Sequence, residues 1–324
     1  MGLTLLGVSI IAFVLFRLVP GDPVIALLPP NATPHDISAL RHALGLDQPL
    51  YVQYVIWLKD ALQGNFGNSI RYGVPALGLI LSRLPVTLTL IIFAEIIALA
   101  LGIVIGTTAV SRKGRISAKI ASSFSFLGFA IPDFLWGIIF IVIFGAILRI
   151  LPVEGLMDLS LNLTSVTGFP LLDALLTGNL PAFVSILEHL ILPSIALALP
   201  QIATIQRTIR SSLLDIANED YILTDKAKGL PERYIFYVRA LKNALIPTVT
   251  LTGVQFAFVL GGSVLIELVF ALPGIGNLAF VAVKWKDLPV MQGIVVVYAV
   301  IVVVTAFGID LLYSYLNPKI RFGE

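Results

Sequence analysis

Residues 84–119 read LPVTLTLIIFAEIIALALGIVIGTTAVSRKGRISAK, and this stretch decides the fold class. Up to Val110 its only charged residue is Glu95, and an apolar run of this length is enough for a helix to cross the hydrocarbon core of a bilayer. Four basic residues and no acid then follow. Because basic loops stay on the cytoplasmic side, this end of the helix is predicted to face the cytoplasm.

The remainder of the chain has the same apolar character. Of its 324 residues, 58% are hydrophobic and 12% are charged, whereas soluble domains carry about 25% charged residues. The further apolar runs that could cross a membrane are residues 3–19, 120–148, 190–208, 245–270 and 290–316. The sequence therefore predicts an all-α polytopic membrane protein with six transmembrane helices.

Basic residues orient these spans. When both ends of the chain are placed inside (N-in/C-in), most of the 21 Lys and Arg residues lie in cytoplasmic loops, as positive-inside orientation requires. Residues 1–19 are then the first transmembrane helix, and not a signal peptide, because no small-residue cleavage site follows them. Residues 20–83 form an extracytoplasmic insertion, and residues 84–324 form a five-helix core with a cytoplasmic loop at 207–245.

The extracytoplasmic insertion carries signals for two amphipathic helices. Thr33 followed by Pro34 is typical of a helix cap and first turn. Asp47 is predicted to cap a second helix that ends at Gly64. Either the two helices lie on the membrane surface, or they form a platform that meets a soluble partner.

Four carboxylates fall within or at the edges of the predicted spans: Glu95, Asp133, Glu267 and Asp310. Ionisable groups at membrane depth are costly and usually face an internal cavity or a partner. Glu95 and Asp133 are therefore candidate pore-lining residues, with bonding to neighbouring helices as the alternative. For Glu267 and Asp310 that alternative is favoured.

Several function classes find no support in the composition. The chain has no cysteine, and its three histidines show no metal-ligand spacing, so no metal site is predicted. No catalytic residue is singled out, and the net charge of +2 does not suggest nucleic acid. We expect the protein not to be an enzyme.

The loop between the fourth and fifth spans is the most informative part of the chain. Residues 220–228 are predicted to form a short helix that ends at Gly229, and Pro231 is placed in the first turn of the next helix. That second helix is predicted to run straight into the fifth span, with one apolar face formed by Ile235, Val238, Leu241 and Leu245. Attraction to anionic lipid explains the basic charge of the loop but not this helix–glycine–helix corner.

This loop resembles a known signature. DY at residues 220–221, TDKAKGL at 224–230 and LKNALIP at 241–247 are similar to the coupling loop of membrane subunits of ATP-binding-cassette (ABC) importers of the dipeptide, oligopeptide and nickel type. Further short motifs of that family occur in order, namely LVPGDP (18–23), GNFGNS (64–69), LPGIG (272–276) and NPKIR (317–321). The family normally begins with a basic stretch that this chain lacks, so we expect Met1 to be a late start or a trimmed end.

The resemblance implies a type I ABC importer permease fold and a coupling site. In the family, the corner helix fits into a cleft of the ATPase subunit, which places six residues at or beside that contact: Asp220, Tyr221, Asp225, Ala227, Lys228 and Gly229. Asp225 departs from the pattern, because the family more often has alanine there. An acid at this position is expected to change the local charge match with the ATPase.

The implied function is that of a translocation-pore subunit of an ATP-driven importer for peptides or similar small solutes, in the cytoplasmic membrane of a prokaryote. The resemblance implies as partners a second similar permease, two ATPase domains and an extracytoplasmic solute-binding protein. The chain itself also contacts membrane lipid. ATP and Mg²⁺ are expected on the ATPase, since this chain has no Gly-x-x-x-x-Gly-Lys-Ser/Thr loop. Related permeases handle peptides, glutathione-like compounds, nickel chelates or sugars.

Two other classes remain as alternatives. A secondary transporter driven by protons through Glu95, Asp133 or Asp310 predicts internal repeats, and none is evident in the sequence. A membrane-embedded enzyme that acts on lipid would need clustered His or carboxylate ligands near an interface, and the sequence shows no such cluster.

Overall fold

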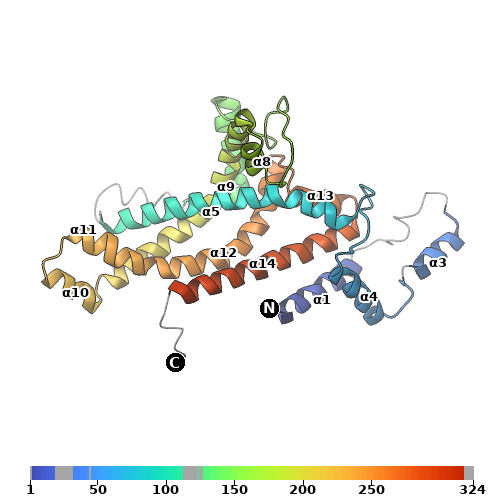
Figure 1. The fold of residues 1–324 in the computed structure, drawn as a ribbon, viewed down its shortest axis with the longest axis horizontal. Helices are drawn as coiled ribbons and strands as arrows, with labels where there is room; N and C mark the ends of the chain where they lie inside the picture. Colours follow the sequence, from blue (N-terminus) through green and yellow to red (C-terminus); the bar gives the residue numbers. More distant parts are fainter. Residues whose placement is uncertain (1, 19–31, 44, 112–122, 124–126, 317–324) are drawn as a thin grey trace. The chain divides into compact units, whose positions relative to one another are not determined.

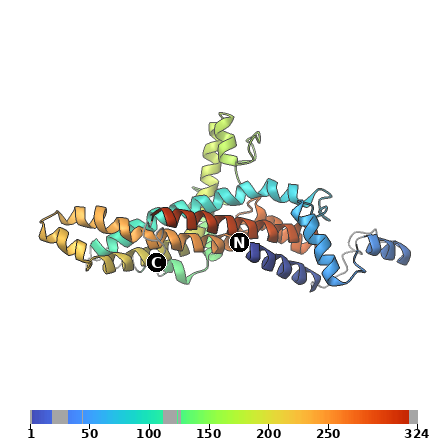
Figure 2. The same cartoon turned by 60° about the horizontal axis from the view of Figure 1, so that its bottom comes forward.

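The computed structural model describes residues 2–18, 32–43, 45–111, 123 and 127–316, and the elements within them are helices (Figures 1 and 2). The described residues hold no strand beyond an isolated bridge between Asn68 and Pro75, so the all-α prediction is confirmed for this part of the chain. Three predicted features lie outside the described residues: most of the LVPGDP motif, the basic loop at 112–119, and the tail at 317–321.

The chain divides into two compact units. The first consists of Met1–Pro85 and Pro273–Val303, and the second of Val86–Leu272 and Val304–Glu324. The helices α5 (Ala76–Ser111) and α14 (Leu288–Leu316) have residues in both units.

Four helices of the described chain are long and apolar enough to cross a membrane. They are α5, α9 (Leu180–Ile216), the continuous helix from Glu232 to Val269, and α14. These helices contain the predicted second, fourth, fifth and sixth spans, apart from the last residue of the fifth. The predicted first span corresponds to the shorter α1 (Gly2–Leu18).

The predicted third span is not one continuous helix. Residues 127–130 are helical, the helix breaks at Ile131 and Pro132, and α7 (Asp133–Phe140) then continues into the π-helix η1 (Ile141–Ile147). The break has a steric cause, because a proline disfavours the α conformation of the residue before it. Hydropathy alone does not register such a break.

In the region predicted as the extracytoplasmic insertion, one cap was predicted correctly and the other was wrong. Thr33 caps α3 (Pro34–Ala43), since its hydroxyl accepts the amide of Asp36 while the carboxylate of Asp36 accepts the amide of Thr33. The next helix, α4 (Leu50–Leu62), has Pro49 at its N-cap. Asp47 instead lies 2.6 Å from Nδ1 of His42, and this hydrogen bond and charge raise the pKa of the imidazole.

Two further helices were not predicted. The segment between the predicted third and fourth spans contains α8 (Pro170–Leu176), and α9 starts at Leu180, ahead of the predicted span at 190. The side chain of Asn179 accepts the amide of Ala182 and so caps this earlier start. The segment after the fifth span forms α13 (Ile275–Lys284). These helices are short or only partly apolar, so a search for long apolar runs passes over them.

The first unit has a core in which the start of α5 packs with α13 and the start of α14. Its buried residues are Ala76, Ile80, Ile275, Leu278, Ala282, Val290 and Ile294. Within the same unit, α1 packs on α4 through the ring of Phe13, which contacts the rings of Tyr54 and Trp57. The hydroxyls of Ser9 and Tyr54 lie 2.8 Å apart and hydrogen bond.

In the second unit α9 is the central helix, with α7, α8 and α12 (Leu241–Val269) packed against it. Helix α5 approaches α9 through Gly102 and Gly106. A Cβ atom at Gly102 would lie 2.6 Å from Cγ2 of Ile205, and one at Gly106 would lie 2.9 Å from the carbonyl oxygen of Gln206. Small residues four apart are the usual means by which two membrane helices approach closely.

This contact makes a stability prediction. Gly106→Ala places a methyl group against a backbone carbonyl that cannot rotate away, so we expect it to cost about 1–3 kcal/mol, as overpacking of a core does. The measurement is thermal unfolding of the purified protein in detergent. Gly261→Ala on α12 is the matched control, because a Cβ atom there meets nothing within 4 Å. Equal unfolding temperatures for the two variants would contradict the close α5–α9 contact.

Candidate functional site

The predicted coupling loop forms a tight corner between two helices. The first helix is α10 (Asp220–Ala227), and the second begins as α11 (Glu232–Tyr234), continues as the π-helix η2 (Ile235–Ala240) and leads without a break into α12. Gly229 has φ +72°, its amide donates to the carbonyl of Lys226, and the amide of Leu230 donates to the carbonyl of Asp225. These two bonds are a Schellman motif, which requires a left-handed residue after the helix.

Two polar contacts tie α10 to the helix that follows it. Nδ2 of Asn243 donates to the hydroxyl of Tyr221 at 2.8 Å, and Nε of Arg239 donates to Oδ2 of Asp225 at 2.9 Å. Within each helix the two partners are four residues apart, so they lie on one face. We call this pair of contacts the brace. It holds α10 against η2 and the start of α12 at two successive turns.

The six predicted coupling residues divide into two groups. Tyr221 and Asp225 belong to the brace, and Asp225 is only 5% exposed. The others, namely Asp220, Ala227, Lys228 and Gly229, are exposed. Asp225 therefore bonds within the chain, and the unusual acid at this position is matched by Arg239. Arg239 was not singled out from the sequence and Asn243 appeared only within the LKNALIP motif, because a pattern along the chain does not show which polar side chains bond across the corner.

The π-helix changes which residues of the second helix are buried. The predicted apolar face through Ile235, Val238, Leu241 and Leu245 is wrong in part, since Val238 is 50% exposed. The buried positions are Ile235, Ala240, Ala244 and Thr248. The first two are five residues apart and the rest are four apart, as expected where a π-turn precedes an α-helix. An α-helical projection therefore has the wrong register through η2.

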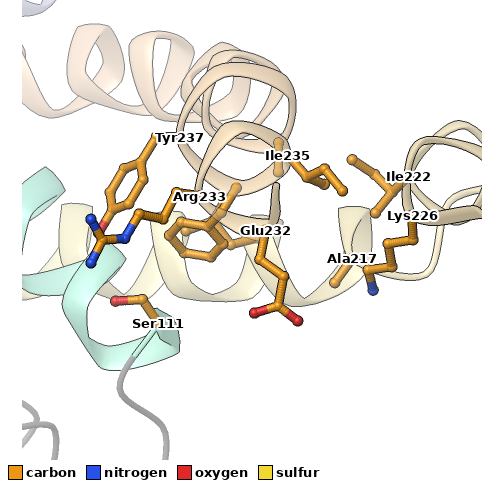
Figure 3. A pocket seen from close by; sticks show the side chains of 11 residues that line it. Ser111, Ala217, Ile222, Lys226, Glu232, Arg233, Ile235 and Tyr237 are labelled. Carbon is orange, nitrogen blue, oxygen red and sulfur yellow. The ribbon is translucent and has the colours of Figure 1, made fainter. Parts of the chain in front are cut away.

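A cavity of about 620 Å³ lies behind the corner. It is lined by the last residue of α5, the end of α9, α10 and the α11–η2 segment (Figure 3). Ile222 of α10 and Ile235 of η2 point toward one another, and Arg233 lies beside Tyr237 (Figure 3). The charged lining residues are Lys226, Glu232 and Arg233. The corner is thus held by the brace and by the buried side chains of Ile222 and Ile235, with the cavity beside them.

The two candidate pore residues lie elsewhere in the second unit. Glu95 on α5 is 9% exposed, and neither of its carboxylate oxygens has a hydrogen-bond partner among the described residues. Asp133 is the first residue of α7, and its Oδ2 would lie 2.6 Å from a Cβ atom on Gly262, beside Leu197. Leu197 is sixteen residues before Leu213, which lines the cavity, or roughly 24 Å along α9. Asp133 is therefore not part of the coupling corner.

The other two intramembrane carboxylates behave differently. Glu267 is fully buried and accepts a hydrogen bond of 2.7 Å from the hydroxyl of Thr87, which confirms bonding to a neighbouring helix. Asp310 is exposed.

Neutral polar atoms that sequence reasoning did not consider are also buried without a hydrogen-bond partner among the described residues of this unit: Trp136 Nε1, Ser194 Oγ, Gln201 Oε1 and Gln255 Oε1. The sequence signal that could have identified these residues is a polar side chain within an apolar run. The described residues contain no His, Cys, Asp and Glu cluster suited to a metal ion.

Comparison with protein families finds two matches that together account for most of the chain. The family described as "Binding-protein-dependent transport system inner membrane component" matches residues 98–322. Its N-terminal counterpart, "Binding-prot-dependent transport system membrane comp, N-term", matches residues 2–91. The first match includes the whole coupling corner.

Similar proteins cover nearly the whole chain. The "Probable D,D-dipeptide transport system permease protein DdpB" of Escherichia coli (strain K12) is 40% identical over 99% of this chain and 95% of its own. The "Di/tripeptide transport system permease protein DppB" of Pseudomonas aeruginosa (strain UCBPP-PA14) is 37% identical over 98% and 95%. The "Oligopeptide transport system permease protein AppB" of Bacillus subtilis (strain 168) is 36% identical over 98% and 95%.

Solved structures share the fold at low sequence identity. A chain of the inward-facing MetNI methionine ABC transporter has a TM-score of 0.51 and 18% identity, and covers 74% of this chain and 94% of its own. A chain of "an amino acid ABC transporter with histidines" has a TM-score of 0.52 and 15% identity over the same shares. At these identities the likeness concerns the fold alone.

The brace makes a prediction about asymmetry. Arg239→Ala leaves the buried Asp225 carboxylate without its partner, and an unsatisfied buried group costs about 1–3 kcal/mol. Asp225→Ala leaves Arg239 with a side chain that is 47% exposed and can bond to water, so it should cost less. The measurement is thermal unfolding of both single variants and the double variant.

The double variant should be more stable than the sum of the two single losses predicts, because neither charge is then left alone. Lys242→Ala, an exposed position on the same helix, is the control and should leave the unfolding temperature unchanged. Strictly additive losses would show that the two side chains do not interact.

Proposed function

The chain belongs to the family of binding-protein-dependent transport system inner membrane components, and on that premise we propose that it is the translocation-pore subunit of an ATP-driven peptide importer. The family identity confirms the resemblance predicted from the coupling loop. Relatives that cover nearly the whole chain are named for transport of di- and tripeptides, D,D-dipeptides and oligopeptides, and this supports a peptide as the solute. The chain is a multi-pass membrane protein and a transport component, not an enzyme.

The observation that carries the coupling role is the exposed end of α10. Ala227, Lys228 and Gly229 project from the corner, while the opposite side of α10 is held by the brace. An exposed helix end whose opposite side is held by two hydrogen bonds is suited to insertion into a cleft of a partner. We infer that this end enters the ATPase subunit. Asp225 would not touch the ATPase but would position α10 through its bond to Arg239.

The brace also suggests how a movement of α10 reaches the membrane. Tyr221 and Asp225 bond to Asn243 and Arg239, and both partners belong to the continuous helix from Glu232 to Val269. A displacement of α10 would therefore move the cytoplasmic end of that helix with it. Closure of the ATPase dimer can shift the pore between inward and outward states only if the two states bind the ATPase differently. The corner provides such a contact.

The partners follow from the same proposal. A second, similar permease would complete the pore, two ATPase domains would bind ATP and Mg²⁺, and a solute-binding protein would deliver the peptide from outside. Both ends of the chain would lie in the cytoplasm of a prokaryote, with the protein in the cytoplasmic membrane. Glu95 and Asp133 are proposed to contact the solute pathway, since both lie within the second unit at membrane-span positions.

The rival proposal is a proton-coupled secondary transporter. In vesicles that contain this chain, its partner permease and the ATPase subunits, we expect peptide uptake to require ATP and the binding protein. A proton gradient without ATP should produce no uptake. Uptake driven by the proton gradient alone, in vesicles without the ATPase, would falsify the importer proposal.

The corner glycine gives a finer test of coupling. Gly229 has φ +72°, and a Cβ atom added to it would meet nothing within 4 Å, so a substitution there meets backbone strain and not a clash. Left-handed backbone costs an ordinary L-residue roughly 1–2 kcal/mol, and a β-branched residue more than asparagine, which tolerates it. Gly229→Val should therefore lower peptide-stimulated ATP hydrolysis by about fivefold or more, and Gly229→Asn much less.

Membrane insertion and assembly with the second permease are the controls for this experiment, and both should survive in the two variants. Equal ATP hydrolysis in wild type, Gly229→Asn and Gly229→Val would show that the shape of the corner does not matter for coupling.

A further inference from the structure

Two segments of the first unit, residues 65–75 and 283–289, are joined through one buried carboxylate. Oδ2 of Asp287 accepts a hydrogen bond of 2.5 Å from the hydroxyl of Ser69 and one of 3.2 Å from the amide of Arg71. Asp287 is 1% exposed. Its carbonyl also accepts the amide of Met291 in the first turn of α14. We call these two joined segments the Asp287 clamp.

The clamp is ordered on both sides of this carboxylate. The isolated bridge between Asn68 and Pro75 closes residues 65–75 into a hairpin, and the hydroxyl of Ser69 also accepts the amide of Tyr72. A Cβ atom at Gly67 would lie 3.8 Å from the ring of Pro289. The GNFGNS motif thus has a physical role here, because its serine reaches Asp287 and its second glycine adopts φ +88°, a left-handed backbone that glycine takes without strain.

The surface that the clamp presents is basic and aromatic. The guanidinium of Arg71 lies 4.2 Å from the centre of the Trp285 ring, and Trp285 and Tyr72 are 50% and 45% exposed. Lys284 and Lys286 are exposed beside Trp285. Asp287 is the only acid in the two segments, and it is buried and already bonded. The exposed charge of the clamp is therefore entirely positive.

In the orientation that we propose, with both ends of the chain in the cytoplasm, residues 283–289 connect the fifth and sixth spans on the extracytoplasmic side. The helix from Glu232 to Val269 begins at the corner and is long enough to cross, whereas α13, with ten residues, is too short to return. Residues 283–289 therefore follow a single crossing. Basic residues are normally depleted from extracytoplasmic loops, so a cluster of them at this position calls for a negatively charged partner.

We propose that the Asp287 clamp is the docking surface for an acidic face of the soluble solute-binding protein. Arginine, tryptophan and tyrosine are the residues that most often dominate binding energy at protein interfaces, and a positive patch would steer an acidic partner toward the pore. The hydrogen bond from the amide of Arg71 to Asp287 and the contact of its guanidinium with the Trp285 ring order these residues before binding, which lowers the ordering cost of association. This inference rests on the proposed function, since it assigns a partner of that function to a surface.

The test measures docking directly. The complete importer in nanodiscs of neutral lipid is titrated with its purified, peptide-loaded solute-binding protein, at low and at physiological salt. Arg71→Glu should weaken binding by about tenfold or more, as loss of a hot-spot residue does. It should also reduce the salt dependence. Lys284→Glu leaves the Arg71–Trp285 contact in place and should also weaken binding. A loss of affinity in both variants shows that misfolding of Arg71→Glu is not its cause.

Lys59→Glu on α4 is the matched control, because Lys59 is an exposed basic residue outside the clamp, and it should leave the affinity unchanged. Unchanged affinity for both clamp variants would overturn the docking assignment while the importer function stands. An equal loss with Lys59→Glu would also overturn it, in favour of a general charge effect. If the clamp variants change binding only in nanodiscs of anionic lipid, the surface binds lipid headgroups instead. Absence of any binding by the wild-type importer would overturn both this inference and the proposed function.

Discussion

A peptide group in the hydrocarbon core of a bilayer has no water to bond, so its hydrogen bonds must be made within the protein. This constraint explains why the described chain is helical and why its interruptions are few. One interruption follows Phe270, where Ala271 adopts φ +50°. The amide of Leu272 returns to the carbonyl of Glu267, and the carbonyl of Phe270 accepts the amide of Gly155 from a distant loop. Phe270 and Leu272 are both buried, so the irregular backbone is covered by protein.

The same reasoning applies to charge. A buried carboxylate must be matched, and three of the matched ones bond to a different segment of the chain. Glu267 is bonded by Thr87, Asp287 by Ser69 and the amide of Arg71, and Asp225 by Arg239. Each of these bonds joins segments that are distant in the sequence or separated by a turn. The carboxylates therefore act as connections within a unit, and two of them support surfaces for which we propose partners.

Glu95 is the exception among the buried carboxylates. Its two oxygens have no hydrogen-bond partner within the described residues, and it lies on the same helix as the close-packed Gly102 and Gly106. An unmatched carboxylate in a bilayer is costly unless a cavity, solute or second subunit satisfies it. This is why Glu95 remains a candidate for the solute pathway. Asp133, set against Gly262 of α12, is the other.

The sequence by itself determined the helical membrane class, most of the long helices, the cap at Thr33 and the helix–Gly229–helix corner, because these depend on local composition and on residues within one or two turns. Its motifs also identified the transporter family. The break at Pro132 also has a local cause, although hydropathy does not register it. Only the tertiary structure decided the π-turn that exposes Val238 and the pairing of Asp225 with Arg239. The contact between residues 65–75 and 283–289 through Asp287 was likewise decided by the tertiary structure. These features arise from contacts between segments far apart in the chain or from a change of helical period, and a pattern read along the sequence contains neither.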